Sequence, residues 1–175
     1  MAGPKKNWRL RKTLARRTQV RTIEPDDLKY VWASYKKGAL ASMGPKFADA
    51  SMTSEQFKQA FEAEAERYSE GWIILTETKN GFIPAGIVLG KIDALLSFTI
   101  IGGIAWFPWA TRRNIVEGTV AFFDVMRKQM PCIGFAVGEH KRLYEVCCMH
   151  GVVRRIGTSH VAIPGQLSAV FETRV

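Results

Sequence analysis

The sequence predicts a single α+β domain, in which seven strands and four helices follow a basic N-terminal arm. Three observations support this prediction. The chain has 175 residues, close to one domain of ordinary size. Hydrophobic residues make up 47% of it and charged residues 23%, so a disordered or collagen-like chain is excluded. Segments with apolar residues at helical spacing alternate with short runs rich in β-branched and aromatic residues.

The excess positive charge belongs to the arm, residues 1–19. The whole chain has 25 Lys and Arg against 16 Asp and Glu, a formal net charge of +9. The arm holds seven basic residues and no acidic one, which leaves 18 basic and 16 acidic residues for the domain, residues 20–175. Three interpretations of the arm stay open: a solubilising tail, a mitochondrial presequence, or a segment that binds nucleic acid or an acidic protein surface. Its basic residues are Lys5, Lys6, Arg9, Arg11, Lys12, Arg16 and Arg17.

The domain is expected to begin with a short strand, residues 20–23, and a helix. Pro25 and the two acids after it are typical of a first helical turn. Apolar residues then repeat at helical spacing over residues 28–35, and Gly38 ends the helix.

After a linker, a second helix and a hairpin are expected. The helix begins at either Thr53 or Ser54, each of which offers an N-cap, and runs to about Gly71. Residues 72–78 form the next strand, and a Lys-Asn-Gly turn leads into the strand at 82–92.

The central apolar run, residues 94–111, has no charged residue in eighteen positions. Its glycines, its proline and its β-branched residues favour a strand that is covered on both faces over a membrane helix. We expect this strand to end near residues 106–109. Thr111 then caps a helix that ends before Pro131.

The last part of the chain is predicted to hold a strand at 132–137, a helix at 139–150 and two further strands. The spacing of its cysteines fits neither a disulfide framework nor a zinc site, so we expect reduced thiols in an intracellular protein and no bound metal. These cysteines are Cys132, Cys147 and Cys148.

This order of elements resembles the GNAT fold of acetyl-CoA dependent N-acetyltransferases over residues 20–175. The opening VRTIEPDDLKYVWASY resembles the first strand and helix of that family. The resemblance implies a mixed, mostly antiparallel central sheet flanked by about four helices, with acetyl-CoA as a possible cofactor.

In that family a loop after the central strand binds the cofactor pyrophosphate at a helix N-terminus, with the pattern Gln/Arg-x-x-Gly-x-Gly/Ala. The matching stretch here is residues 113–118, in which Val116 replaces the first glycine. A β-branched residue there crowds the approach to phosphate. Two interpretations of this stretch therefore stay open: it binds the cofactor, or its arginines only solvate an exposed helix start. The residues that the resemblance implies for the cofactor are Arg112, Arg113, Asn114, Glu117, Gly118 and Thr119.

The catalytic signal is weaker than the fold signal. Alignment on Gly151 puts Cys147 where the family has the tyrosine that protonates the leaving thiolate. Tyr144 lies about one helical turn earlier, so it is the candidate catalytic residue, although packing is the alternative. The two central strands contain no acid to serve as a base, and the histidines are scattered along the chain.

Short GNAT-like proteins with such eroded motifs occur in tailed bacteriophages, and residues 137–157 resemble them. The first hypothesis is therefore a degenerate GNAT-fold protein that acts as a virion or assembly component in a bacteriophage. Its partners would be other protein subunits and, through the arm, nucleic acid, and its location the host cytoplasm or the virion. The alternative is an active acetyl-CoA dependent N-acetyltransferase. A third possibility is that the arm itself binds nucleic acid without sequence specificity.

Overall fold

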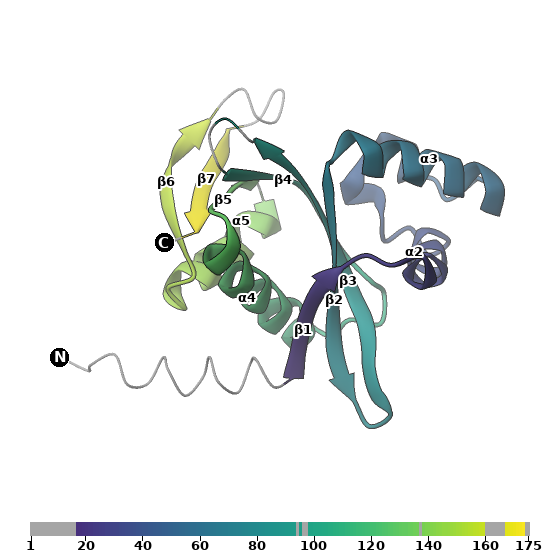
Figure 1. Ribbon diagram of the computed structural model, residues 1–175, viewed down its shortest axis with the longest axis horizontal. Coiled ribbons are helices and arrows are strands. Elements are labelled where there is room, and N and C mark those ends of the chain that lie inside the picture. Colours follow the sequence, from purple (N-terminus) through teal and green to yellow (C-terminus); the bar gives the residue numbers. More distant parts are fainter. Residues whose placement is uncertain (1–16, 94, 96–97, 137, 160–166, 174–175) are drawn as a thin grey trace.

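A seven-stranded mixed sheet organises the computed structural model, which describes residues 17–93, 95, 98–136, 138–159 and 167–173 (Figure 1). The strand order is β1-β2-β3-β4-β5-β7-β6, and every neighbouring pair is antiparallel except β4 and β5. This confirms the expected fold class and the expected order of strands and helices. None of the helices in the described ranges is long and apolar enough to cross a membrane.

The bounds of the elements lie close to those expected from the sequence. The strands are β1 (Thr18–Thr22), β2 (Glu70–Thr78), β3 (Gly81–Asp93), β4 (Phe98–Trp106), β5 (Cys132–Ala136), β6 (Val153–Ser159) and β7 (Ser168–Thr173). The helices are α2 (Leu28–Tyr35), α3 (Ser54–Arg67), α4 (Arg112–Gln129) and α5 (Gly138–Met149). Three short 3-10 helices accompany them: η1 (Pro25–Asp27), η2 (Ala41–Met43) and η3 (Pro45–Phe47).

Helices cover both faces of the sheet, α2 and α3 on one and α4 and α5 on the other (Figure 1). Side chains alternate between the two faces along each strand, so neighbouring residues enter different cores. On β2, for example, Ile74 lies in the same core as Phe122 of α4, whereas Ile73 lies in the core that contains Phe57 of α3. The central strands are thus buried on both sides, as their continuous apolar sequence predicts.

The connector between α2 and α3, residues 36–53, is more ordered than the linker expected from its glycine and proline. It contains η2 and η3, and its residues Leu40, Met43 and Phe47 are buried in the core beneath α3. The sequence pattern misses this because single apolar residues in short 3-10 turns have no period to detect.

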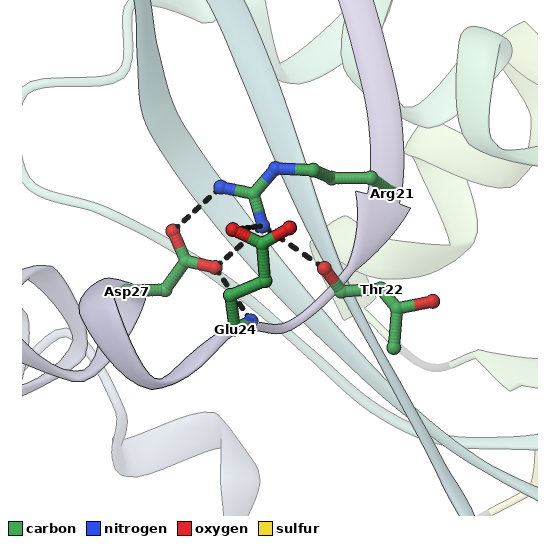
Figure 2. Close-up of polar contacts among 4 residues, drawn as sticks. All are labelled: Arg21, Thr22, Glu24 and Asp27. Atoms are coloured by element: carbon green, nitrogen blue, oxygen red, sulfur yellow. Dashed lines mark hydrogen bonds and ion pairs between the residues drawn. The ribbon is translucent and has the colours of Figure 1, made fainter.

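A charged pair joins β1 to the first helical turn (Figure 2). Arg21 donates two hydrogen bonds to the Asp27 carboxylate, at 2.7 and 2.9 Å, and lies 3.6 Å from Glu24. Asp27 is only 2% exposed and also accepts the amide hydrogen of Glu24. The hydrogen bond to Asp27 raises the pKa of Arg21 above its ordinary value. This pair fixes the direction in which the chain leaves β1 and enters α2.

Candidate functional site

The parallel strands β4 and β5 pair over a short distance and then separate. Their ladder contains only three residue pairs and ends at Ile101 and Gly134, although β4 continues to Trp106. Gly102 is a bulge residue, because its two neighbours pair with adjacent residues of β3. A bulge bends a strand and increases its twist, which accounts for the separation. Residues 102–106 therefore have no strand partner on the β5 side within the described chain, and we call them the unpaired edge of β4.

The positive end of α4 lies just beyond the unpaired edge. Two hydrogen bonds hold the intervening turn against β3: Phe107 N–H donates to the Ala85 carbonyl at 2.9 Å, and the Trp109 indole donates to the Pro84 carbonyl at 2.7 Å. The first amides of a helix have no acceptors inside the helix, and its dipole attracts anions. The fold thus fixes an anion-attracting helix end beside an open strand edge.

The chain itself satisfies part of this helix end. Thr111 caps α4, as expected: its hydroxyl accepts the Asn114 amide at 3.2 Å, and its own amide donates to the Asn114 side chain at 3.0 Å. The Asn114 amide group also donates to the Thr76 hydroxyl at 2.7 Å. Asn114, a predicted cofactor ligand, is therefore occupied by contacts within the protein.

Gly118 and Thr119, also predicted to bind the cofactor, are buried on the sheet side of α4. A Cβ atom on Gly118 would lie 2.8 Å from the Trp106 ring and 2.9 Å from Ile74, so the glycine makes room for these side chains. Thr119 is 1% exposed, and its hydroxyl donates to the Ile115 carbonyl at 2.7 Å. Both residues therefore have a structural explanation that involves no ligand.

The exposed cations at this helix end are Arg112 and Arg113. They are the first two residues of α4, so their amides have no acceptor within the helix. The Arg113 guanidinium contacts the Glu117 carboxylate at 2.7 Å. The arginine side chain of this pair is mostly exposed. Of the six predicted cofactor residues, these two present positive charge to a ligand.

Trp106, which sequence reasoning missed, supplies a buried donor at the junction between the unpaired edge of β4 and the N-terminus of α4. Its indole nitrogen is buried and has no hydrogen-bond partner in the part of the chain that the structure describes. The ring packs between Gly86 of β3 and Gly118 of α4. A buried donor without an acceptor is costly, so an acceptor from a ligand would stabilise it.

Tyr144 lies behind β5, in the core beneath α5. Its ring packs between Phe123 and Phe171, with centroids 5.2 and 5.0 Å away, and the residue is 3% exposed. A Cβ atom on Gly134 would lie 2.6 Å from its hydroxyl, so the phenol reaches the last residue of β5 that pairs with β4. Burial raises the pKa of Tyr144 well above its ordinary value, which keeps the hydroxyl protonated. Its catalytic role stays a prediction.

Cys147, which the resemblance aligns with the family's tyrosine, is fully buried in the same core. Burial raises the pKa of its thiol to about 12. A thiol in this state is neutral and unreactive at ordinary pH.

A second tyrosine, Tyr68, covers the opposite face of the point where the strands separate. Its ring lies directly over Gly102, where a side chain of any size would collide with it. It is half-buried and comes from the end of α3, whereas Tyr144 belongs to the layer of α4 and α5. The sequence does not indicate this contact, because only the fold brings Tyr68 to residue 102.

The described residues contain no group of three or more His, Cys, Asp and Glu side chains that is suited to a metal ion. The junction instead combines exposed arginines, a helix N-terminus, a buried indole donor and an unpaired strand edge. This combination suits an anionic ligand that also carries amide or carbonyl groups.

No protein-family model matches this sequence, and no curated protein matches it. Solved structures do match. The GNAT-family acetyltransferase from Bacillus anthracis is 16% identical with a TM-score of 0.63, over 89% of this chain and 93% of that one. The spermidine N-acetyltransferase from Vibrio cholerae, in complex with CoA and spermine, is 11% identical with a TM-score of 0.60, over 89% and 93%. AAC(6')-Ib, in complex with ribostamycin and coenzyme A, is 12% identical with a TM-score of 0.64, over 90% and 94%. At these identities the similarity establishes the fold: the chain has the GNAT fold.

Proposed function

We propose that the protein binds acetyl-CoA along the unpaired edge of β4 and transfers the acetyl group to an amine. The observation that carries this proposal is the separation of β4 from β5 beside the N-terminus of α4. Two similar structures were solved with coenzyme A, which supports the choice of ligand. The virion role expected from the sequence gains no support from these neighbours, which are described as acetyltransferases or as bound to coenzyme A and ribostamycin.

The residues at the junction fit a coenzyme A thioester. Arg112 and Arg113 would hold the diphosphate, together with their own free helix amides. The buried Trp106 indole would gain an acceptor from the ligand. Because the amides of Thr111 and Asn114 are already used in the cap, phosphate binding here depends more on arginine side chains than on a glycine loop.

When bound, acetyl-CoA supplies an acyl group activated as a thioester. The protein's part is to orient the acceptor amine, since holding two reactants together lowers the barrier substantially. A neutral amine needs little help from a base, which agrees with the lack of an acid in β4 and β5. Tyr144 would hold a proton at its hydroxyl for the leaving thiolate.

Titration calorimetry with coenzyme A tests the proposed site. The double variant Arg112→Ala/Arg113→Ala should bind about tenfold or more weakly than wild type, because charge-assisted phosphate contacts are lost. The matched control, Arg127→Ala/Lys128→Ala, removes the same charge from the last turn of the same helix and should leave binding unchanged. Equal weakening in both variants would indicate a general charge effect and count against the site, and so would the absence of binding to wild type.

We propose separately that the arm docks on nucleic acid or on an acidic protein surface. Its seven cations without an acidic residue favour this. Arg17 is exposed, and residues 1–16 lie outside the described residues. Binding to a single-stranded DNA oligonucleotide should weaken steeply as salt rises, and deletion of residues 1–16 should remove most of that dependence. An unchanged salt dependence would contradict the nucleic-acid form of the proposal.

A further inference from the structure

The backbone groups of β4 alternate in direction, and this defines which of them face the unpaired edge. The Phe107 amide donates to the Ala85 carbonyl and therefore points toward β3. In an extended strand, the N–H and C=O groups of successive residues point to opposite sides. The backbone groups of Ile104 and Trp106 consequently point away from β3, toward the side from which β5 has separated.

The 3-10 helix η2, from the connector between α2 and α3, lies against this edge. The Ser42 hydroxyl, in η2, donates to the Ile104 carbonyl at 3.1 Å across 62 residues of sequence. Met43 lies beside it, with its Cα 3.9 Å from the position that a Cβ atom of Gly103 would occupy. Ser42 itself is exposed, whereas Met43 is 8% exposed and anchors η2 in the core.

The connector holds η2 in this place through contacts on both sides of it. Lys36 donates to the Ala50 carbonyl at 3.0 Å, and Lys46 donates to the Ala60 carbonyl at 3.2 Å and pairs with Glu64 at 2.6 Å. With the backbone fixed, the Ser42 hydroxyl can still rotate about its side-chain bond. Its hydrogen bond to Ile104 is therefore easily exchanged, without any movement of the helix layer.

An extended ligand that carries amide groups binds an unpaired strand edge through main-chain hydrogen bonds, as an added strand does. The Ile104 carbonyl is such an acceptor, and Ser42 already occupies it. Coenzyme A carries two amides on the chain beyond its diphosphate, so the proposed ligand has the donors to replace Ser42.

We propose that Ser42 is a gate on the coenzyme A site: its hydroxyl competes with the ligand's amide N–H for the Ile104 carbonyl and lowers the affinity. This inference rests on the proposed function. Removal of the hydroxyl frees the carbonyl, so Ser42→Ala should bind coenzyme A about two- to tenfold more tightly than wild type, the range given by one net hydrogen bond. Ser42→Thr keeps the hydroxyl and should stay close to wild type.

Calorimetry with two ligands tests the gate. ADP carries the diphosphate but lacks the amide chain, so its affinity should be the same for Ser42→Ala and wild type. Ser51→Ala is the matched control, because Ser51 lies on the same connector but its hydroxyl donates to the Asp49 carboxylate, at 2.9 Å. It should leave both affinities unchanged.

The possible outcomes separate the gate from the function on which it rests. If coenzyme A binds wild type and Ser42→Ala equally, the gate is wrong and the proposed function stands. If Ser42→Ala shifts ADP and coenzyme A alike, the gate is also wrong, because the effect does not involve the amide chain. If coenzyme A binds neither wild type nor any variant, the proposed function fails and the gate with it.

Discussion

At the residue scale, glycines mark the places where the layers of this domain come closest. Gly118 lets α4 approach the Trp106 ring and Ile74, and Gly134 lets the Tyr144 hydroxyl reach β5. Sequence reasoning interpreted Gly118 through a phosphate-binding pattern, since a glycine at a helix start has that meaning in many nucleotide sites. In the structure it is the seventh residue of α4 and faces the sheet. The structural role of such a glycine can thus be assigned only when its neighbours in space are known.

Gly118→Ala should therefore destabilise the protein. The added methyl group has to displace the Trp106 ring or Ile74, which we expect to lower the free energy of unfolding by about 1–2 kcal/mol, after the gain in helix propensity is included. Urea unfolding measures this change. Gly157→Ala is the control, because nothing lies within 4 Å of its Cβ position, and it should be neutral or slightly stabilising. A Gly118→Ala protein as stable as wild type would contradict the packing explanation.

At the scale of elements, local signals predicted the helices well and the contacts between elements poorly. The cap at Thr111 and the helix it begins follow from neighbouring residues, so the sequence was sufficient. The pair between Arg21 and Asp27 also joins residues close in sequence. The sequence pattern, however, does not show which of the nearby acids, Glu24, Asp26 or Asp27, pairs with the arginine. Only burial selects Asp27 from these acids.

Asp27→Asn should weaken the junction between β1 and α2. The variant keeps the shape of the side chain but leaves Arg21 without its buried carboxylate, so the free energy of unfolding should fall by about 2 kcal/mol. Hydrogen exchange should quicken over residues 18–35 more than elsewhere. Asp26→Asn changes the same charge at an exposed neighbour and should have little effect. Equal losses in the two variants would show that net charge, and not the buried pair, is responsible.

At the scale of the whole molecule, the sequence predicts the number and order of the elements because hydrophobic period is a local property. It does not predict the separation of β4 from β5, which follows from a bulge and from pairing between distant residues. The candidate site divides in the same way. The exposed arginines at the start of α4 follow from the family resemblance, whereas Trp106, Tyr68 and Ser42 reach the site only through the tertiary fold.

The stability of the whole molecule should fall at high pH, because it has buried thiols and a buried phenol. Burial raises the pKa of Cys132 and Cys147 from 9.0 to about 12, and it also raises that of Tyr144. An unfolded thiol ionises near pH 9 while the folded one stays neutral, so the unfolded state binds fewer protons between pH 9 and 12. The free energy of unfolding should thus be unaffected by these thiols below pH 9. Above it, the loss should be about 1.4 kcal/mol per pH unit for each thiol.

Urea unfolding from pH 8 to pH 11 measures this slope. The variant Cys132→Ala/Cys147→Ala should be less stable at pH 8, because it leaves cavities, but its stability should fall less steeply above pH 9. Cys148→Ala is the comparison, since that cysteine is only partly buried. Parallel pH profiles for wild type and the double variant would contradict the assignment of the slope to these thiols.

The central claim is that coenzyme A binds where β4 and β5 separate, and a crystal structure of the complex tests it most directly. The diphosphate is predicted to lie at the N-terminus of α4 within reach of Arg112 and Arg113, with the amide chain along residues 102–106 of β4. Coenzyme A bound elsewhere on the molecule, or crystals grown at saturating coenzyme A with no ligand at this edge, would contradict the claim.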